Sequence, residues 1–171
     1  MDTRRKARLT RAISQLARVL DEEGIHVWLG GDWGCYALDP EHRPLESSVI
    51  FYLRADDGPD VRRTAEDMGH AVVDMSPSGF VTEKGDFLIS WHLLWLDEMG
   101  EEVSFDESDR PFTWPKGSFR TDFRGVLSKI PVRIVDPQAE MLHDNAVSQR
   151  GTKSGRRSDI SKVKAIIHDR M

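Results

Sequence analysis

The chain has 171 residues, with 24 Lys and Arg against 29 Asp and Glu, a formal net charge of −5 and 39% hydrophobic residues. This length and hydrophobic content fit one globular domain. The excess of acid argues against a dedicated nucleic-acid-binding protein, and the single cysteine, Cys35, excludes an internal disulfide framework and a multi-cysteine zinc site. No apolar run approaches the roughly 20 residues that a membrane span needs. We therefore expect a soluble, cytoplasmic protein without a secretory signal.

The first segment is predicted to be an amphipathic helix that Asp2 or Thr3 caps and Gly24 ends. Its apolar residues recur at spacings of three and four, and they are Leu9, Ile13, Leu16 and Leu20. Five basic residues crowd its first half, and they are Arg4, Arg5, Lys6, Arg8 and Arg11. The helix dipole disfavours positive charge there. We interpret the basic cluster as a solvated face, and an acidic partner is the alternative.

Strands and helices alternate after this segment, which predicts an α/β or α+β domain. The expected strands lie at 25–29, 48–53, 71–73, 80–81 and 87–96, and the expected helices at 33–38 and 59–69. A hairpin around Lys84-Gly85 is expected to join two of the strands. Further along we expect a structured loop at 106–119, a hairpin at 126–135, a helix from Asp136 to about Val147, a polar loop at 148–157 and a closing helix at 158–169. The helical segment 136–171 is expected to pack on the core formed by 1–135, giving one compact domain.

The turn Gly30-Gly31-Asp32-Trp33-Gly34 joins a predicted strand to a predicted helix. Backbone N–H groups at such a helix start suit a phosphate. The Asp32 carboxylate would compete with an anionic ligand for them. A tight turn capped by Asp32 is therefore the alternative interpretation.

Several short motifs follow one another along most of the chain, and they are Val27 to Leu38, His42-Arg43-Pro44, Ile89 to Leu93, Trp114-Pro115, Gly125 to Leu127, Ile130 to Arg133, Gln138 to His143 and Arg157 to Ile160. In this order they resemble the aminoglycoside and lincosamide nucleotidyltransferases. The resemblance implies a nucleotidyltransferase-like fold, with a mixed β-sheet flanked by helices and a helical C-terminal segment.

The resemblance also implies a catalytic metal site. In that family a Gly-Gly turn is paired with Asp-x-Asp on the next strand and a third carboxylate on a later one, and together they hold two Mg²⁺ ions on a nucleoside triphosphate. Position by position, these carboxylates fall on Ser47-Ser48-Val49 and on Ser90, with His92 retained. Because Mg²⁺ is held through carboxylates and phosphates, we expect neither a metal nor a cofactor here and predict that metal-dependent nucleotidyl transfer is lost. The alternative is that Glu46, Asp56 or Asp57 replaces the missing ligands.

The cleft is nevertheless expected to keep a mixed set of chemical groups. Ser47 and Val49 share one face of their strand, Ser90 and His92 share one face of theirs, and both faces are expected to line the cleft. The expected catalytic groups are His92, Asp32 and Glu46, and the expected ligand-binding residues are Trp33, Arg43, Ser47, Val49, Ser90 and Trp114. This set fits a small organic ligand and metal-independent acid–base chemistry. For His92 the alternative is a packed histidine that hydrogen-bonds a backbone carbonyl.

Three functions remain open from the residues alone. The first is a protein of nucleotidyltransferase fold that binds a small metabolite in the ancestral cleft, with His92, Asp32 or Glu46 moving a proton. The second is a non-catalytic ligand- or partner-binding protein, and the third an active adenylyltransferase with displaced carboxylates. For all three we expect a small-molecule ligand, no nucleic acid, no membrane, and a monomer or homodimer.

Overall fold

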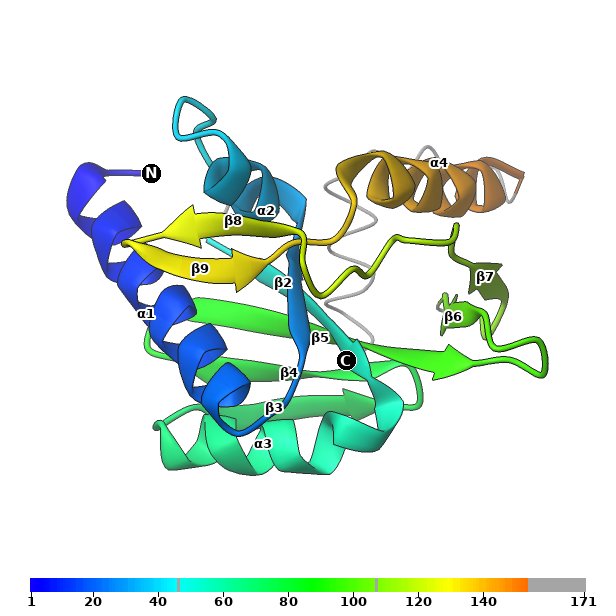
Figure 1. Ribbon diagram of the computed structural model, residues 1–171, viewed down its shortest axis with the longest axis horizontal. Coiled ribbons are helices and arrows are strands. Elements are labelled where there is room, and N and C mark those ends of the chain that lie inside the picture. Colours follow the sequence, from blue (N-terminus) through cyan, green and yellow to red (C-terminus); the bar gives the residue numbers. More distant parts are fainter. Residues whose placement is uncertain (46, 107, 154–171) are drawn as a thin grey trace.

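The computed structural model describes residues 1–45, 47–106 and 108–153 (Figure 1). The closing helix expected at 158–169 and the candidate residue Glu46 lie outside these residues. Among the helices that the structure describes, none combines the length and the apolar character needed to cross a membrane.

A mixed β-sheet forms the centre of the molecule, with the strand order β1-β2-β5-β4-β3 (Figure 1). These strands are β1 (Val27–Gly30), β2 (Val49–Arg54), β5 (Phe87–Leu96), β4 (Gly79–Lys84) and β3 (Ala71–Ser76). Only β2 and β5 run parallel among these neighbours, and the β4–β5 hairpin expected around Lys84-Gly85 is confirmed. The far end of β5 continues the sheet through β6 (Glu102–Phe105) to β7 (Pro111–Thr113), and β8 (Arg124–Leu127) and β9 (Ile130–Arg133) form the separate hairpin expected at 126–135.

The described helices are α1 (Thr3–Glu22), α2 (Gly31–Leu38), α3 (Gly58–Asp67) and α4 (Pro137–Lys153), with a short 3-10 turn at Ala55–Asp57. Asp2 caps α1, because its carboxylate accepts a hydrogen bond from the Arg5 backbone N–H at 2.8 Å. Asp136 caps α4 in the same way, accepting from the backbone N–H groups of Gln138 and Ala139. Both caps were expected from the sequence.

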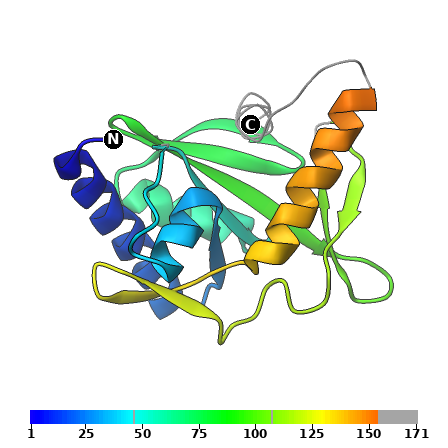
Figure 2. The same ribbon diagram turned by 90° about the horizontal axis from the view of Figure 1, so that it is seen from above.

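The sheet has two differently covered faces. Alternate residues of β2 and β5, including Phe51 and Trp91, join α1 and α3 in the main apolar core. The intervening residues, including Tyr52 and Leu94, lie in a second cluster with Trp114 and the start of α4. In Figure 1, α3 lies below the sheet and α4 above it, and Figure 2 shows α4 set well apart from α1.

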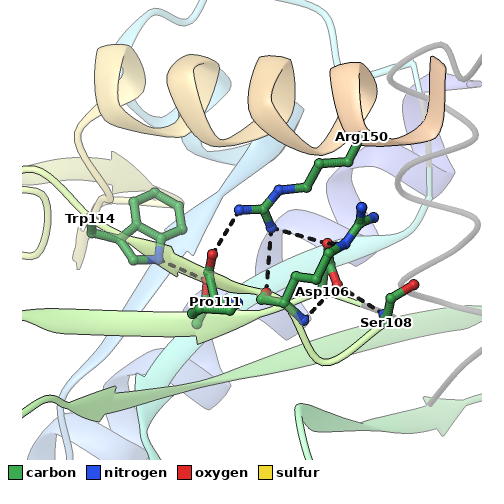
Figure 3. A network of polar contacts seen from close by, with 7 residues as sticks. Asp106, Ser108, Pro111, Trp114 and Arg150 are labelled. Carbon is green, nitrogen blue, oxygen red and sulfur yellow. Dashed lines mark hydrogen bonds and ion pairs between the residues drawn. The ribbon is translucent and has the colours of Figure 1, made fainter. Parts of the chain in front are cut away.

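A polar network holds the last turns of α4 against the β6–β7 hairpin (Figure 3). Arg150 donates to the Asp106 carboxylate at 3.0 Å and to the Pro111 carbonyl oxygen at 2.7 Å. The same carboxylate accepts from the backbone N–H groups of Ser108 and Arg110. Burial alone would raise the pKa of Asp106, but the hydrogen bonds from Arg110, Ser108 and Arg150 outweigh it and lower this pKa.

The expected polar loop at 148–157 is wrong for its first six residues, because α4 continues through Lys153. The ion pair between Arg150 and Asp106 joins residues 44 positions apart, so local composition could not reveal it. The expected loop at 106–119 likewise contains one short strand, β7, which pairs with β6.

Candidate functional site

The turn between β1 and α2 is closed by a carboxylate from α4. The backbone N–H of Gly31 donates to both carboxylate oxygens of Glu140 at 2.9 Å. Gly31 has φ +60°, which favours glycine. A Cβ at Gly30 would overlap Glu140 Oε1 and the Tyr52 ring, so this position also requires glycine. The amide that could bind an external anion therefore binds the chain's own carboxylate.

Tyr52 connects this carboxylate to the sheet. Its hydroxyl donates to Glu140 Oε1 at 3.0 Å, and both side chains are buried. Burial, followed by the charges of Glu140 and Asp144, raises the pKa of Tyr52 well above its ordinary value. Tyr52 is thus a neutral donor that holds Glu140 in place, and Glu140 supplies the acceptor.

His92 lies beside Tyr52 in the parallel register of β2 and β5, with their ring centroids 5.2 Å apart. The residue is 8% exposed, and its Nε2 has no hydrogen-bond partner among the described residues. Burial, followed by the charge of His143, lowers the pKa of His92 to about 3. His92 is therefore a neutral imidazole at physiological pH, with one unsatisfied polar atom.

Aromatic side chains enclose the same region. The His143 ring stacks on Trp114 with centroids 4.7 Å apart and an interplanar angle of 12°. Trp114 also meets Tyr52 edge-on at 5.3 Å, and its indole N–H donates to Ser104 Oγ at 2.9 Å. His143 Nδ1 lies 3.3 Å from the Asp144 carboxylate. We call Tyr52, His92, Trp114, Glu140 and His143 the α4-face site.

Of the residues predicted to form the cleft, the structure brings His92, Trp114 and Ser90 to this side of the sheet. Ser90 pairs with Ile50 in the parallel register and is buried. Directly paired residues point to the same face, so Ser90 shares the face of His92, two residues further on. Ser47 is half-buried just before β2 begins.

Val49 does not share this face. It pairs with Ile89, is 0% exposed and packs in the main core with Phe51. The expectation that Val49 and Ser90 line one cleft is corrected by this register, in which Ile50 takes the place beside Ser90. Because side chains alternate between the faces of a strand, an alignment displaced by one residue exchanges the two faces.

The other predicted residues serve the local fold. The Asp32 carboxylate accepts from the Leu45 backbone N–H at 3.3 Å and lies 3.6 Å from His42 Nε2, so it fixes the loop that follows α2. Trp33 is 1% exposed in the main core, where it meets Tyr36 edge-on. Arg43 is exposed in the loop before β2.

The described residues do not fit the two-metal centre that the resemblance implies. Among them, no group of three or more His, Cys, Asp or Glu side chains is placed to hold a metal ion. Ile50 and Ser90 lie side by side on the α4 face and supply a hydrocarbon and a hydroxyl, neither of which is a carboxylate ligand for Mg²⁺. We therefore derive no reaction step through Mg²⁺.

Sequence reasoning assigned no role to Tyr52, Glu140 or His143. Strand alternation could have indicated Tyr52, because it lies two residues after Ile50 and therefore shares its face, opposite to that of Val49. Glu140 and His143 fall within the stretch Gln138 to His143, which was noted for its resemblance. Their contacts with Gly31 and Trp114 join distant parts of the chain, and no local pattern indicates them.

Comparisons with known proteins identify the family. The family model for aminoglycoside-2''-adenylyltransferase matches residues 12–161. The solution structure of the antibiotic-resistance factor ANT(2'')-Ia is 18% identical, covers 98% of this chain and 84% of its own, and has a TM-score of 0.69. A crystal structure of ANT(2'')-Ia in complex with adenylyl-2''-tobramycin is 18% identical, with coverages of 94% and 95% and a TM-score of 0.65. The lincomycin-bound lincosamide adenylyltransferase LnuA is 16% identical, with coverages of 73% and 78% and a TM-score of 0.59.

A search of curated proteins finds no match. At identities below one fifth, the solved structures establish the fold, and the nucleotidyltransferase-like α+β architecture expected from the motifs is confirmed. The family model spans most of the chain, and this chain therefore belongs to the aminoglycoside-2''-adenylyltransferase family.

Proposed function

We propose that this chain binds a small organic molecule at the α4-face site without metal-dependent nucleotidyl transfer. The observation that carries the proposal is the position of Glu140, whose carboxylate accepts from the Gly31 backbone N–H and from the Tyr52 hydroxyl. A nucleotide phosphate at this turn would have to displace a buried, doubly held carboxylate.

Electrostatics makes that displacement unfavourable. A phosphate oxygen about 4 Å from a fixed carboxylate is repelled by about 4 kcal/mol at the effective dielectric of a protein surface. In metal-dependent enzymes Mg²⁺ offsets the charge of the phosphates. Ile50 and Ser90 supply no carboxylate for it on this face.

The same groups favour a neutral or cationic ligand. The Glu140 and Asp144 charges both act on Tyr52, so the site is electronegative. The buried Trp114 and His143 rings stack on each other next to it. The unsatisfied Nε2 of His92 offers one hydrogen bond to a bound molecule.

Binding is favoured over acid–base catalysis. A general base works best when its pKa lies near the operating pH, and the pKa of His92 is lowered to about 3. Asp32, the other described candidate, is engaged with the loop before β2. Glu46 lies outside the described residues.

Tobramycin and lincomycin are the first compounds to test, because structures of ANT(2'')-Ia and LnuA contain adenylyl-2''-tobramycin and lincomycin, respectively. Amine-bearing compounds of similar size would be screened with them by thermal shift, with and without Mg²⁺ and ATP. We expect compounds that raise the unfolding temperature without Mg²⁺, and no adenylylated product by mass spectrometry. An adenylylated product, or a stabilising effect of Mg²⁺ and ATP together, would support the active adenylyltransferase instead.

His92→Gln and His70→Gln form a matched pair for this screen. Both histidines are buried and each has a ring nitrogen without a partner among the described residues, but His70 packs against Phe87, away from the α4-face site. We expect His92→Gln to weaken ligand binding about tenfold, equal to one hydrogen bond of about 1.4 kcal/mol, and His70→Gln to leave it unchanged. Equal effects of the two substitutions would contradict this placement of the ligand.

A further inference from the structure

A groove of about 570 Å³ lies between α1 and the β4–β5 turn, and its described lining residues come from these two parts of the chain. Arg4, Arg8 and Arg11 line it from α1, and Lys84 lines it from the β4–β5 turn. Its apolar surface includes Ala12 and Phe87, which both pack against the main core. We call it the α1 groove.

One carboxylate of the chain already binds within this groove. Arg8 Nη2 lies 2.7 and 2.8 Å from the two oxygens of Asp86, and Arg5 Nε lies 3.3 Å from one of them. Arg4 and Arg11 lie one turn away from Arg8 in either direction, on the same side of α1. Neither Arg4 nor Arg11 makes an ion pair with a residue that the structure describes, whereas Arg5 and Arg8 both pair with Asp86. The groove thus has one filled carboxylate position between two exposed guanidinium groups.

The basic row opposes the stability of its own helix. Apart from the Asp2 cap, the first turn of α1 carries no acidic residue, so one carboxylate opposes the helix dipole's unfavourable interaction with five basic residues. Like charges three and four residues apart, as at Arg4, Arg8 and Arg11, cost a few tenths of a kcal/mol per pair. Positions where local choices oppose the fold are expected at functional sites. An anionic ligand would offset both costs.

We propose that the α1 groove binds a short acidic segment of a partner protein. Arg4 and Arg11 are about 10 Å apart along the helix axis, the length of about three residues of extended chain. Acidic side chains of such a segment would reach these two arginines, and an apolar side chain between them would lie on Ala12 and Phe87. The whole chain is acidic, with a net charge of −5, so an acidic segment is attracted only to the basic groove and not to the molecule as a whole.

A protein segment fits this groove better than a nucleic acid does. A nucleic acid extends a dense row of phosphates beyond any one groove, over a molecule that carries an excess of acid. A short peptide presents its charges only where the arginines are. Its apolar side chains can also pack against Phe87, whereas phosphates cannot.

The experiment measures the binding of a short fluorescein-labelled peptide, in which glutamates alternate with leucines, to the full chain by fluorescence anisotropy. The test variant is Arg4→Gln with Arg11→Gln. The matched control is Arg18→Gln with Arg63→Gln, which removes two exposed positive charges outside the groove, on α1 and α3. Both variants have the same net charge, and circular dichroism compares their helix content.

We expect saturable binding that weakens about tenfold in the groove variant and less than about twofold in the control, as for two exposed charge pairs. Absence of saturable binding to the wild-type chain would overturn the proposal. Equal weakening in both variants would also overturn it, because net charge alone would then explain binding. Equally tight binding of single-stranded DNA of the same charge would show a general polyanion surface, which also contradicts it.

Discussion

The two faces of the sheet bury different kinds of side chain. On the α1 and α3 face, Phe51 stacks on Trp91 with an interplanar angle of 16°, within a cluster formed by apolar residues. On the α4 face, the neighbouring positions Tyr52 and His92 bury a hydroxyl that donates to Glu140 and an imidazole that lies beside the Tyr52 ring. Adjacent residues of the same strands therefore serve different purposes, since one face supplies stability and the other places polar atoms at a cost.

The largest expected effect is on the apolar face. Phe51→Ala removes a ring that is 0% exposed and leaves a cavity beside Trp91. We expect the free energy of unfolding to fall by about 3–5 kcal/mol. Urea denaturation measures it. Tyr52→Phe is the control on the other face, because it keeps the ring and removes one hydrogen bond to the Glu140 carboxylate, for a loss of about 1.5 kcal/mol. Similar losses in the two variants would contradict the difference between the faces.

Glu140→Ala tests the polar face directly. The substitution removes the acceptor of the half-buried Gly31 N–H and of the buried Tyr52 hydroxyl. Because hydrogen bonds to charged groups are among the stronger ones, we expect a loss of about 2–3 kcal/mol in urea denaturation. In a double-mutant cycle with Tyr52→Phe, we expect a coupling energy of about 1 kcal/mol. If Glu140→Ala left the free energy of unfolding unchanged, Glu140 would not hold the turn, and another anion could bind there. That outcome would contradict the proposed function as well.

A third prediction uses pH to separate the faces. The pKa of His92 is lowered by burial from 6.5 to about 3 in the folded chain. Between these values the unfolded state binds a proton that the folded state does not. The buried, neutral His92 therefore costs no stability above pH 6.5, and the free energy of unfolding falls progressively as the pH falls from 6.5 toward 3. The slope of unfolding free energy against pH reaches about 1.4 kcal/mol per pH unit for one such group.

The His92→Gln variant is expected to lose this part of the slope when urea denaturation is repeated at a series of pH values. His70→Gln is the comparison, since the pKa of His70 is lowered only to about 4, by burial and by the charge of Lys84. Its effect should therefore level off at a higher pH than that of His92. An unchanged slope in His92→Gln would mean that this imidazole is protonated in the folded chain.

The same division explains how far the sequence could predict the molecule. Elements that depend on local periodicity were predicted well, as in α1, with its apolar residues at spacings of three and four, and in the β4–β5 hairpin. The α4-face site depends on contacts between distant residues, such as Gly31 and Glu140, and no local pattern reveals them. Val49 shows a further difficulty, because an error of one residue in aligning a strand moves a residue to the opposite face. Family motifs correctly indicated the fold, but the chemistry of the site depends on the register.

The smallest expected effect concerns the exposed side of α1, whose other side packs in the apolar core. In the free chain, Arg4→Gln with Arg11→Gln removes two positive charges from the first turns of a helix whose dipole they oppose. It also relieves repulsion with Arg8, which keeps its ion pair with Asp86. We expect the unfolding free energy to rise by about 0.5 kcal/mol at low salt, and the gain to shrink as salt screens the charges. Thermal unfolding at two salt concentrations measures both. A loss of stability would mean that Arg4 and Arg11 make contacts that stabilise the folded chain. Those contacts would then explain why α1 carries these charges, and no acidic partner segment would be needed to explain them.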